Sequence, residues 1–226
     1  MSFFGKGMKI ETDIKPTEIK SIVRYDVFDK VLESLTKDGY EPISLSQNAE
    51  SRIQQGKDAK ISIYGNWVRE GVLYVPNGKN KFLPVSPMLE SAKEATQAHR
   101  EEAEFYLKGE QIGPYLADSV DFPEETIEIS TDELDYEDLT VHAFGGEDGA
   151  RAYGEFLYDV GLEKLLIYAV DKDYVNKQKW PFVRQIFFRN LDGMSALYSF
   201  WGIHSDHEMR GVKMTKPAKK QRQAFF

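Results

Sequence analysis

The sequence has no cysteine at any of its 226 positions. A disulfide scaffold, a thiol nucleophile and a zinc site built on thiolates are therefore excluded. The absence of cysteine also mildly favours a reducing environment, so we expect a cytoplasmic, intracellular location.

Long hydrophobic runs are missing as well. The longest apolar stretches, residues 165–170 and 196–203, are far shorter than the roughly 20 residues that cross a bilayer. The apolar start of the chain at Phe3 and Phe4 gives way to charged residues too early for a secretory signal. We therefore expect no signal peptide and no membrane partner.

Positive charge is absent from one long stretch. No lysine or arginine occurs between Lys108 and Arg151, whereas 13 aspartates and glutamates do. Since the whole chain has a net charge of −8, the rest of the chain is net positive. Basic residues gather near the C-terminal end, where six of them follow Glu208 without an acidic residue: Arg210, Lys213, Lys216, Lys219, Lys220 and Arg222.

Such segregated charge indicates charged partners. We predict that the six basic residues, together with Phe225 and Phe226 as apolar anchors, bind nucleic acid or an acidic protein surface. We predict a second, acidic docking surface in the middle of the chain, formed by Asp132, Glu133, Asp135, Glu137 and Asp138. A solvated acidic surface without a partner is the alternative interpretation of that stretch.

Hydrophobic periodicity predicts an α+β fold. Helices are expected after Asp26, over residues 86–107 and after Gly146. Strands are expected in a three-stranded meander over 59–85, at 127–129 and 139–143, and at 165–170 in the middle of the sheet. A hairpin is expected from 182–188 and 196–203. The predicted architecture is a mixed or mainly antiparallel sheet with about three flanking helices and an extended basic C-terminal tail.

The predicted domain organisation is a single α+β domain over residues 1–211, followed by a basic, aromatic-tipped tail over 212–226. With 41% apolar residues, a chain of this length can bury a substantial core. A sub-boundary near residues 109–123 is the alternative, because glycine and proline interrupt the chain there.

One cluster has the composition of a metal site. His204, Asp206, His207 and Glu208 combine imidazole and carboxylate groups, which suit zinc, iron or manganese. A helical turn would group His204, His207 and Glu208, whereas a strand would group His204, Asp206 and Glu208. A polar turn without a metal is the alternative, and we expect no other cofactor.

Catalytic motifs are not apparent. The glycines around Glu147 lack the spacing of a phosphate-binding loop, and Ser195 lacks the setting of a nucleophile elbow. The first hypothesis is therefore a non-enzymatic binding or assembly subunit that associates with protein or nucleic acid. Two alternatives stay open: a metal-dependent, hydrolase-like enzyme that uses the His204–His207 cluster, and an acidic inhibitor that imitates nucleic acid.

Overall fold

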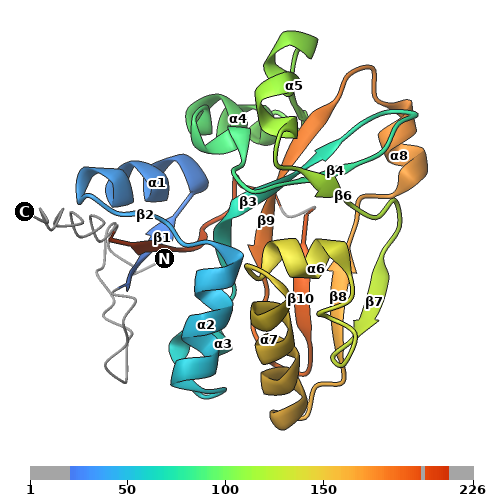
Figure 1. Cartoon of the computed structure of the whole chain (residues 1–226). Coiled ribbons are helices and arrows are strands. Elements are labelled where there is room, and N and C mark those ends of the chain that lie inside the picture. The colour runs from blue at the N-terminus through green and yellow to red at the C-terminus, as the bar shows by residue number, and fades with distance from the viewer. Residues whose placement is uncertain (1–20, 200–201, 214–226) are drawn as a thin grey trace, which may run out of the picture.

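The computed structural model describes residues 21–199 and 202–213, and its centre is one large mixed sheet (Figure 1). Within the described residues the sheet contains eleven strands, and its main path runs β1-β11-β3-β9-β10-β8-β7. The strands are β1 (Ser21–Asp26), β2 (Glu41–Pro42), β3 (Asn66–Tyr74), β4 (Lys81–Leu83), β5 (Phe105–Tyr106), β6 (Val120–Asp121), β7 (Ile127–Ser130), β8 (Lys164–Tyr168), β9 (Phe182–Phe188), β10 (Ser195–Tyr198) and β11 (His207–Val212).

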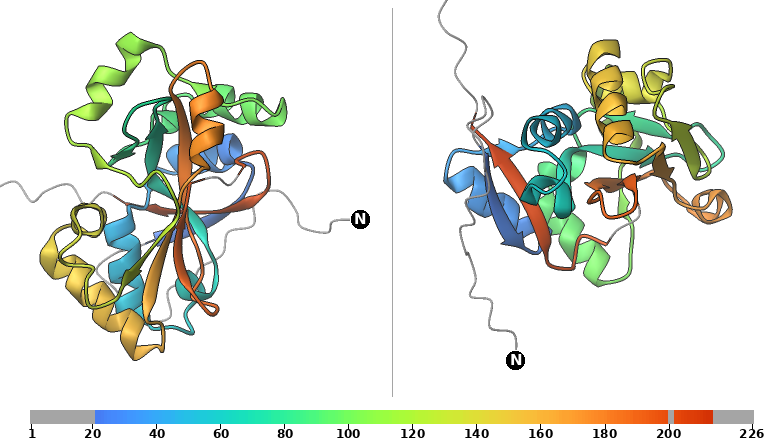
Figure 2. Two further views of the ribbon diagram at one scale, coloured as in Figure 1. Left: turned by 90° about the vertical axis from the view of Figure 1, so that its right-hand side faces the viewer. Right: turned by 90° about the horizontal axis from the view of Figure 1, so that it is seen from below.

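Both antiparallel and parallel pairs build the sheet. The long strands β3 and β9 are antiparallel neighbours, whereas β11 runs parallel to β3 and β10 runs parallel to β8. The first described strand pairs antiparallel with the last one, with Ser21 opposite Val212. The two ends of the described chain therefore lie together at one side of the molecule, as Figure 2 shows.

Helices cover both faces of the sheet. Over the described ranges, eight α-helices and one 3-10 helix are present. They are α1 (Phe28–Lys37), α2 (Leu45–Gln55), α3 (Lys60–Ile63), η1 (Pro87–Leu89), α4 (Ala92–Arg100), α5 (Gly109–Leu116), α6 (Asp138–Ala143), α7 (Glu147–Asp159) and α8 (Lys172–Lys177). None of these helices is long and apolar enough to cross a membrane.

Two hydrophobic cores lie on opposite faces of the sheet, and alternation along β3 assigns its side chains to them. Val68 and Val72 join the core beneath α2 and α7, whereas Trp67 and Leu73 join the core beneath α1 and α4. Because successive side chains of a strand point to opposite faces, a strand covered on both sides must be apolar at nearly every position. Strand β3 meets this requirement only in part, because it also buries the polar residues Asn66 and Glu70. The ring of Phe28 in α1 packs edge-on against Trp67 at 5.4 Å.

The predicted α+β class with a mixed sheet is confirmed, but the prediction of about three flanking helices was too low. One predicted strand begins later than expected, at Asn66, and another is absent. Residues 60–63 form helix α3, where the Ser62 hydroxyl donates to the Gly56 carbonyl at 2.8 Å and closes the turn. Residues 138–143 form helix α6, where the Thr140 hydroxyl donates to the Glu137 carbonyl at 3.0 Å. Alternation over so few residues does not distinguish a strand from a short helix.

Other predictions needed new boundaries. The helix expected over 86–107 is a 3-10 turn followed by α4, which ends before Glu102, a residue with φ of 57°. Strand β8 was expected in the middle of the sheet, but it lies one place in from the edge strand β7 and is partly exposed at Leu166 and Tyr168. The hairpin of β9 and β10 is confirmed, with Leu197 opposite Phe188.

Candidate binding site

A hollow of about 470 Å³ opens where α7 meets the loop between β7 and α6. The helix lies against this loop because Gly154 has no side chain. A Cβ atom there would stand 2.1 Å from the carbonyl oxygen of Thr131, which is far closer than real atoms approach. Gly154 thus sets the spacing between the two walls of the hollow.

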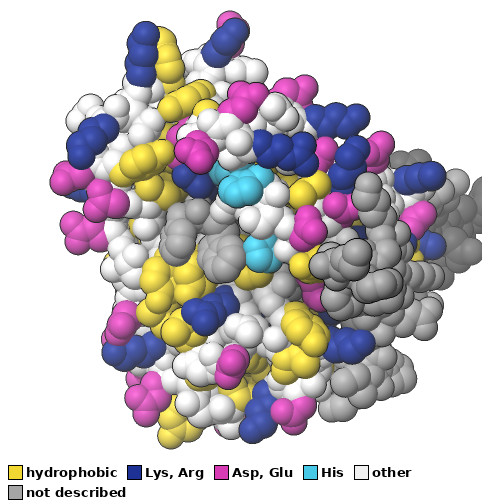
Figure 3. Space-filling model, turned by 180° about the vertical axis from the view of Figure 1, so that it is seen from behind, with side chains coloured by type: hydrophobic (Ala, Val, Ile, Leu, Met, Phe, Trp, Pro, Cys, Tyr) yellow, Lys and Arg dark blue, Asp and Glu magenta, His cyan; other side chains and the backbone are white. Residues whose placement is uncertain are grey.

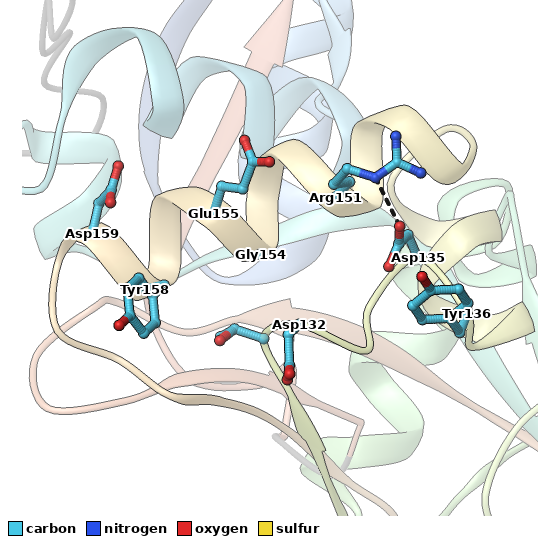
Figure 4. Close-up of a pocket in the computed structure, with 9 residues that line it drawn as sticks. Asp132, Asp135, Tyr136, Arg151, Gly154, Glu155, Tyr158 and Asp159 are labelled. Carbon is cyan, nitrogen blue, oxygen red and sulfur yellow. Dashed lines mark hydrogen bonds and ion pairs between the residues drawn. The ribbon is translucent and has the colours of Figure 1, made fainter.

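Acidic and aromatic side chains line the hollow (Figure 4). One wall, the β7–α6 loop, contributes Asp132, Asp135 and Tyr136, and the other wall, helix α7, contributes its own set. The α7 residues are Arg151, Glu155, Tyr158 and Asp159. We call this group of side chains the acidic hollow.

A single arginine partly balances the carboxylates. Arg151 Nε lies 2.8 Å from Asp135 Oδ2, and a second guanidinium nitrogen lies 3.2 Å from Asp148 Oδ1. The hydrogen bond to Asp135 raises the pKa of Arg151. Within the described part of the chain, Asp132, Glu155 and Asp159 form no ion pair with a lysine or arginine. Asp132 accepts a hydrogen bond from the Ser130 hydroxyl, which leaves its charge uncompensated.

Two tyrosine side chains beside these carboxylates are largely exposed to solvent. Tyr136 is 80% exposed and Tyr158 is 69% exposed, the highest values among the large apolar side chains described. In Figure 4, Asp132 lies between the two rings. Exposed aromatic faces attract ammonium and guanidinium groups, and carboxylates attract the same groups. The arrangement is therefore suited to holding cationic side chains.

Only two of the five residues of the predicted acidic docking surface belong to the acidic hollow. Asp132 and Asp135 line the hollow, whereas Glu133, Glu137 and Asp138 are exposed outside it. The α7 wall and Tyr136 were not predicted from the sequence. A signal was present, because residues 151, 155 and 159 follow one another at intervals of four and so share a face of a helix.

The predicted basic tail needs a correction at Arg210. This residue lies in β11, is 1% exposed, and donates a hydrogen bond to Ser21 Oγ at 2.7 Å. Arg210 is thus a buried part of the sheet. Lys213 is exposed, with its ammonium group 5.3 Å from the centre of the Tyr40 ring. The other predicted partner-binding residues lie outside the described residues: Lys216, Lys219, Lys220, Arg222, Phe225 and Phe226.

The predicted metal ligands do not converge. His204 and Asp206 are exposed in the turn before β11, and His207 and Glu208 are neighbours within that strand, so their side chains point to opposite faces. The His207 ring packs edge-on against Trp67 at 5.3 Å, and burial lowers the pKa of His207. In residues 21–199 and 202–213, no three potential ligand side chains stand close enough together to hold a metal ion.

The face seen from behind differs from the acidic hollow. Basic and acidic side chains are interspersed over it, with hydrophobic side chains between them, as Figure 3 shows. Opposite charges are therefore close neighbours on this face, whereas one sign predominates around the hollow.

Comparison with known proteins places the fold. A solved structure described as "Accommodation of massive sequence variation in Nanoarchaeota by the C-type lectin fold" matches this chain with a TM-score of 0.66 and 17% identity. The match covers 88% of this chain and 100% of that one. The chain therefore has a C-type lectin-like fold. No family model and no curated protein matches the sequence.

Proposed function

We propose that this chain is a non-enzymatic binding protein whose acidic hollow takes up lysine or arginine side chains of a basic protein segment. The observation that carries the proposal is the combination of three unpaired carboxylates with two largely exposed tyrosine rings on facing walls. The C-type lectin-like fold supports a binding role for the chain.

Both attractive terms act on the same ligand group. An exposed carboxylate attracts a cation with about 0.2–1 kcal/mol, and an exposed aromatic face adds about 0.5–1 kcal/mol. A segment with several basic residues can use several of these contacts at once, because Asp132 and Asp159 lie on different walls. Single basic side chains are expected to bind weakly and clustered ones more tightly.

Nucleic acid is a second candidate partner for another part of the chain. Phosphates would be repelled by the acidic hollow, so nucleic acid would have to contact the basic residues near the C-terminal end. Those residues lie almost entirely outside the described part of the chain. The described geometry therefore favours a basic protein segment, and we propose that the encounter takes place in the cytoplasm.

Calorimetric titration with a hexa-arginine peptide at low salt tests the proposal. The double variant Asp132→Asn, Asp159→Asn removes one unpaired carboxylate from each wall, and we expect it to bind the peptide about tenfold more weakly. Tyr158→Ala removes a ring and is expected to weaken binding about threefold. Raising the salt concentration to about 0.5 M should reduce both differences.

A matched control changes the same total charge elsewhere. Asp58 and Asp118 are exposed and lie outside the hollow, so Asp58→Asn, Asp118→Asn should bind the peptide almost as the unmodified protein does. Equal losses in the two double variants would show that net charge, and not the acidic hollow, attracts the peptide. The proposal would then be wrong.

A further inference from the structure

We infer that the acidic hollow is occupied by a segment of this same protein, residues 214–226, supplied by its own chain or by a second copy. The inference rests on the proposed function and names the partner. The segment follows directly after Lys213, the last residue that the structure describes.

Charge complementarity is the first argument. Residues 214–226 contain four basic residues and no acidic one. The hollow offers four carboxylates and a single guanidinium, and that guanidinium already pairs with Asp135 and Asp148. The segment thus has the charge that the hollow leaves uncompensated.

The segment also provides groups for the tyrosine rings. Lys219 and Lys220 are adjacent to each other, and Arg222 follows closely, so cations can reach both walls from one short stretch. A guanidinium or ammonium group placed over Tyr136 or Tyr158 would gain the attraction of the ring face. Arginine in particular both stacks on an aromatic ring and pairs with a carboxylate.

The fold restricts the path. In Figures 1 and 2, helix α2 lies between β11, where the segment begins, and α7, which carries one wall of the hollow. The two helices pack together, since Arg52 of α2 donates to the Tyr153 hydroxyl of α7 at 3.3 Å. Thirteen extended residues span at most about 45 Å. Within this length we infer that the segment either passes over α2 to its own hollow or enters the hollow of a neighbouring copy.

The first experiment compares full-length chains for their affinity toward a synthetic peptide of residues 214–226. In the tail-neutral variant, Lys216, Lys219, Lys220 and Arg222 are replaced by glutamine, so the hollow loses its occupant. We expect this variant to bind the peptide about tenfold more tightly than the unmodified protein, in which the segment competes. A charge-retaining control exchanges lysine for arginine and arginine for lysine at the same four positions, and it should behave as the unmodified protein does.

The second experiment asks which chain supplies the segment. The hollow variant Asp132→Asn, Asp159→Asn keeps an intact segment, and the tail-neutral variant keeps an intact hollow. Sedimentation of an equimolar mixture should show a heterodimer if the segment enters a neighbouring copy. If the mixture stays monomeric while the tenfold difference in affinity holds, the segment occupies the hollow of its own chain. Either result supports the inference.

The failure of the inference is distinguishable from that of the proposed function. Equal affinity of the unmodified protein and the tail-neutral variant for the peptide would overturn the inference, because nothing would then compete for the hollow. If hexa-arginine still binds both proteins in a manner that depends on Asp132 and Asp159, the proposed function stands. If hexa-arginine binds neither protein, both fall.

Discussion

The acidic stretch without lysine or arginine has two parts that differ in their partners: the carboxylates of one part pair with lysines, and several carboxylates of the other do not. Near the β4–β6 edge, Asp121 lies 2.7 Å from Lys79 Nζ and 2.6 Å from Lys81 Nζ, and Glu124 lies 2.5 Å from Lys172 Nζ. Around the acidic hollow, several carboxylates have no basic partner among the described residues. The sequence shows the same absence of lysine and arginine in both parts.

A stretch of acidic residues in the sequence therefore does not by itself make an acidic surface. The lysines that neutralise Asp121 lie about 40 residues earlier in the chain, Lys81 in β4 and Lys79 in the loop before it, and the pairing of β4 with β6 brings them close. Their hydrogen bonds, first that of Lys79 and then that of Lys81, lower the pKa of Asp121 to about 2. Among residues 21–199 and 202–213, no strand brings a lysine to the hollow, so the negative charge remains available there for a ligand.

The largest expected effect concerns a third environment, a carboxylate removed from water. Glu70 is 4% exposed, and each of its oxygens lies 3.1 Å from the Leu45 N–H at the start of α2. Burial raises the pKa of Glu70 to about 7. Since the unfolded chain releases this proton near its ordinary pKa, the stabilising effect of the protonated form is complete below about pH 4.5 and disappears as the pH rises through 7.

Glu70→Gln should therefore remove a pH-dependent change in the free energy of unfolding of up to about 3 kcal/mol between pH 4.5 and 7. Urea unfolding across this range measures it. Buried His99 acts in the opposite direction, because desolvation lowers its pKa to about 4 and protonation of the unfolded chain below pH 6.5 costs stability. The comparison must therefore be made between Glu70→Gln and the unmodified protein. Identical pH profiles would contradict the prediction.

A smaller effect is expected when the walls of the hollow are forced apart. Gly154→Ala places a Cβ atom against the Thr131 carbonyl, so α7 must shift, and we expect a loss of about 2 kcal/mol in stability together with weaker peptide binding. Gly113→Ala is the matched control, because a Cβ atom there meets nothing within 4 Å and the site is helical. The control should be slightly stabilised, by about 0.5 kcal/mol. Equal stability of the two variants would show that the walls can adapt.

A still smaller effect is expected when Asp121 loses its lysine partners and so becomes an unpaired carboxylate like those of the hollow. Lys79→Gln, Lys81→Gln removes both partners of Asp121, and we expect its pKa to rise from about 2 to about 3.9, its ordinary value. Carbon-detected NMR titration measures this value directly. Affinity for hexa-arginine should change less than about twofold, because one freed carboxylate contributes little without an aromatic wall. An unchanged pKa would mean that the lysines do not hold Asp121 as described.

The sequence predicted correctly those features that depend on a single helix or strand. Apolar residues at helical spacing predicted the helix after Asp26 and the helix after Gly146, and both are confirmed. The strand predictions for residues 59–65 and 139–143 were wrong. Their short alternating patterns fit a strand, but local hydrogen bonds from a hydroxyl to a carbonyl close helical turns there. The metal cluster failed to assemble because β11 turns His207 and Glu208 to opposite faces.

Three features can be read from the amino-acid order alone: the elements whose periodicity is long, the separation of acidic from basic residues, and the presence of Asp132 and Asp135 in an acidic segment. Which charges meet depends on the packed fold. It joined Lys79 to Asp121 and set α7 against the loop that carries Asp132, through contacts between residues far apart in the chain. Periodicity reports the face of one element, whereas a site depends on how two elements pack, and packing is set by side chains that a linear pattern does not relate to each other.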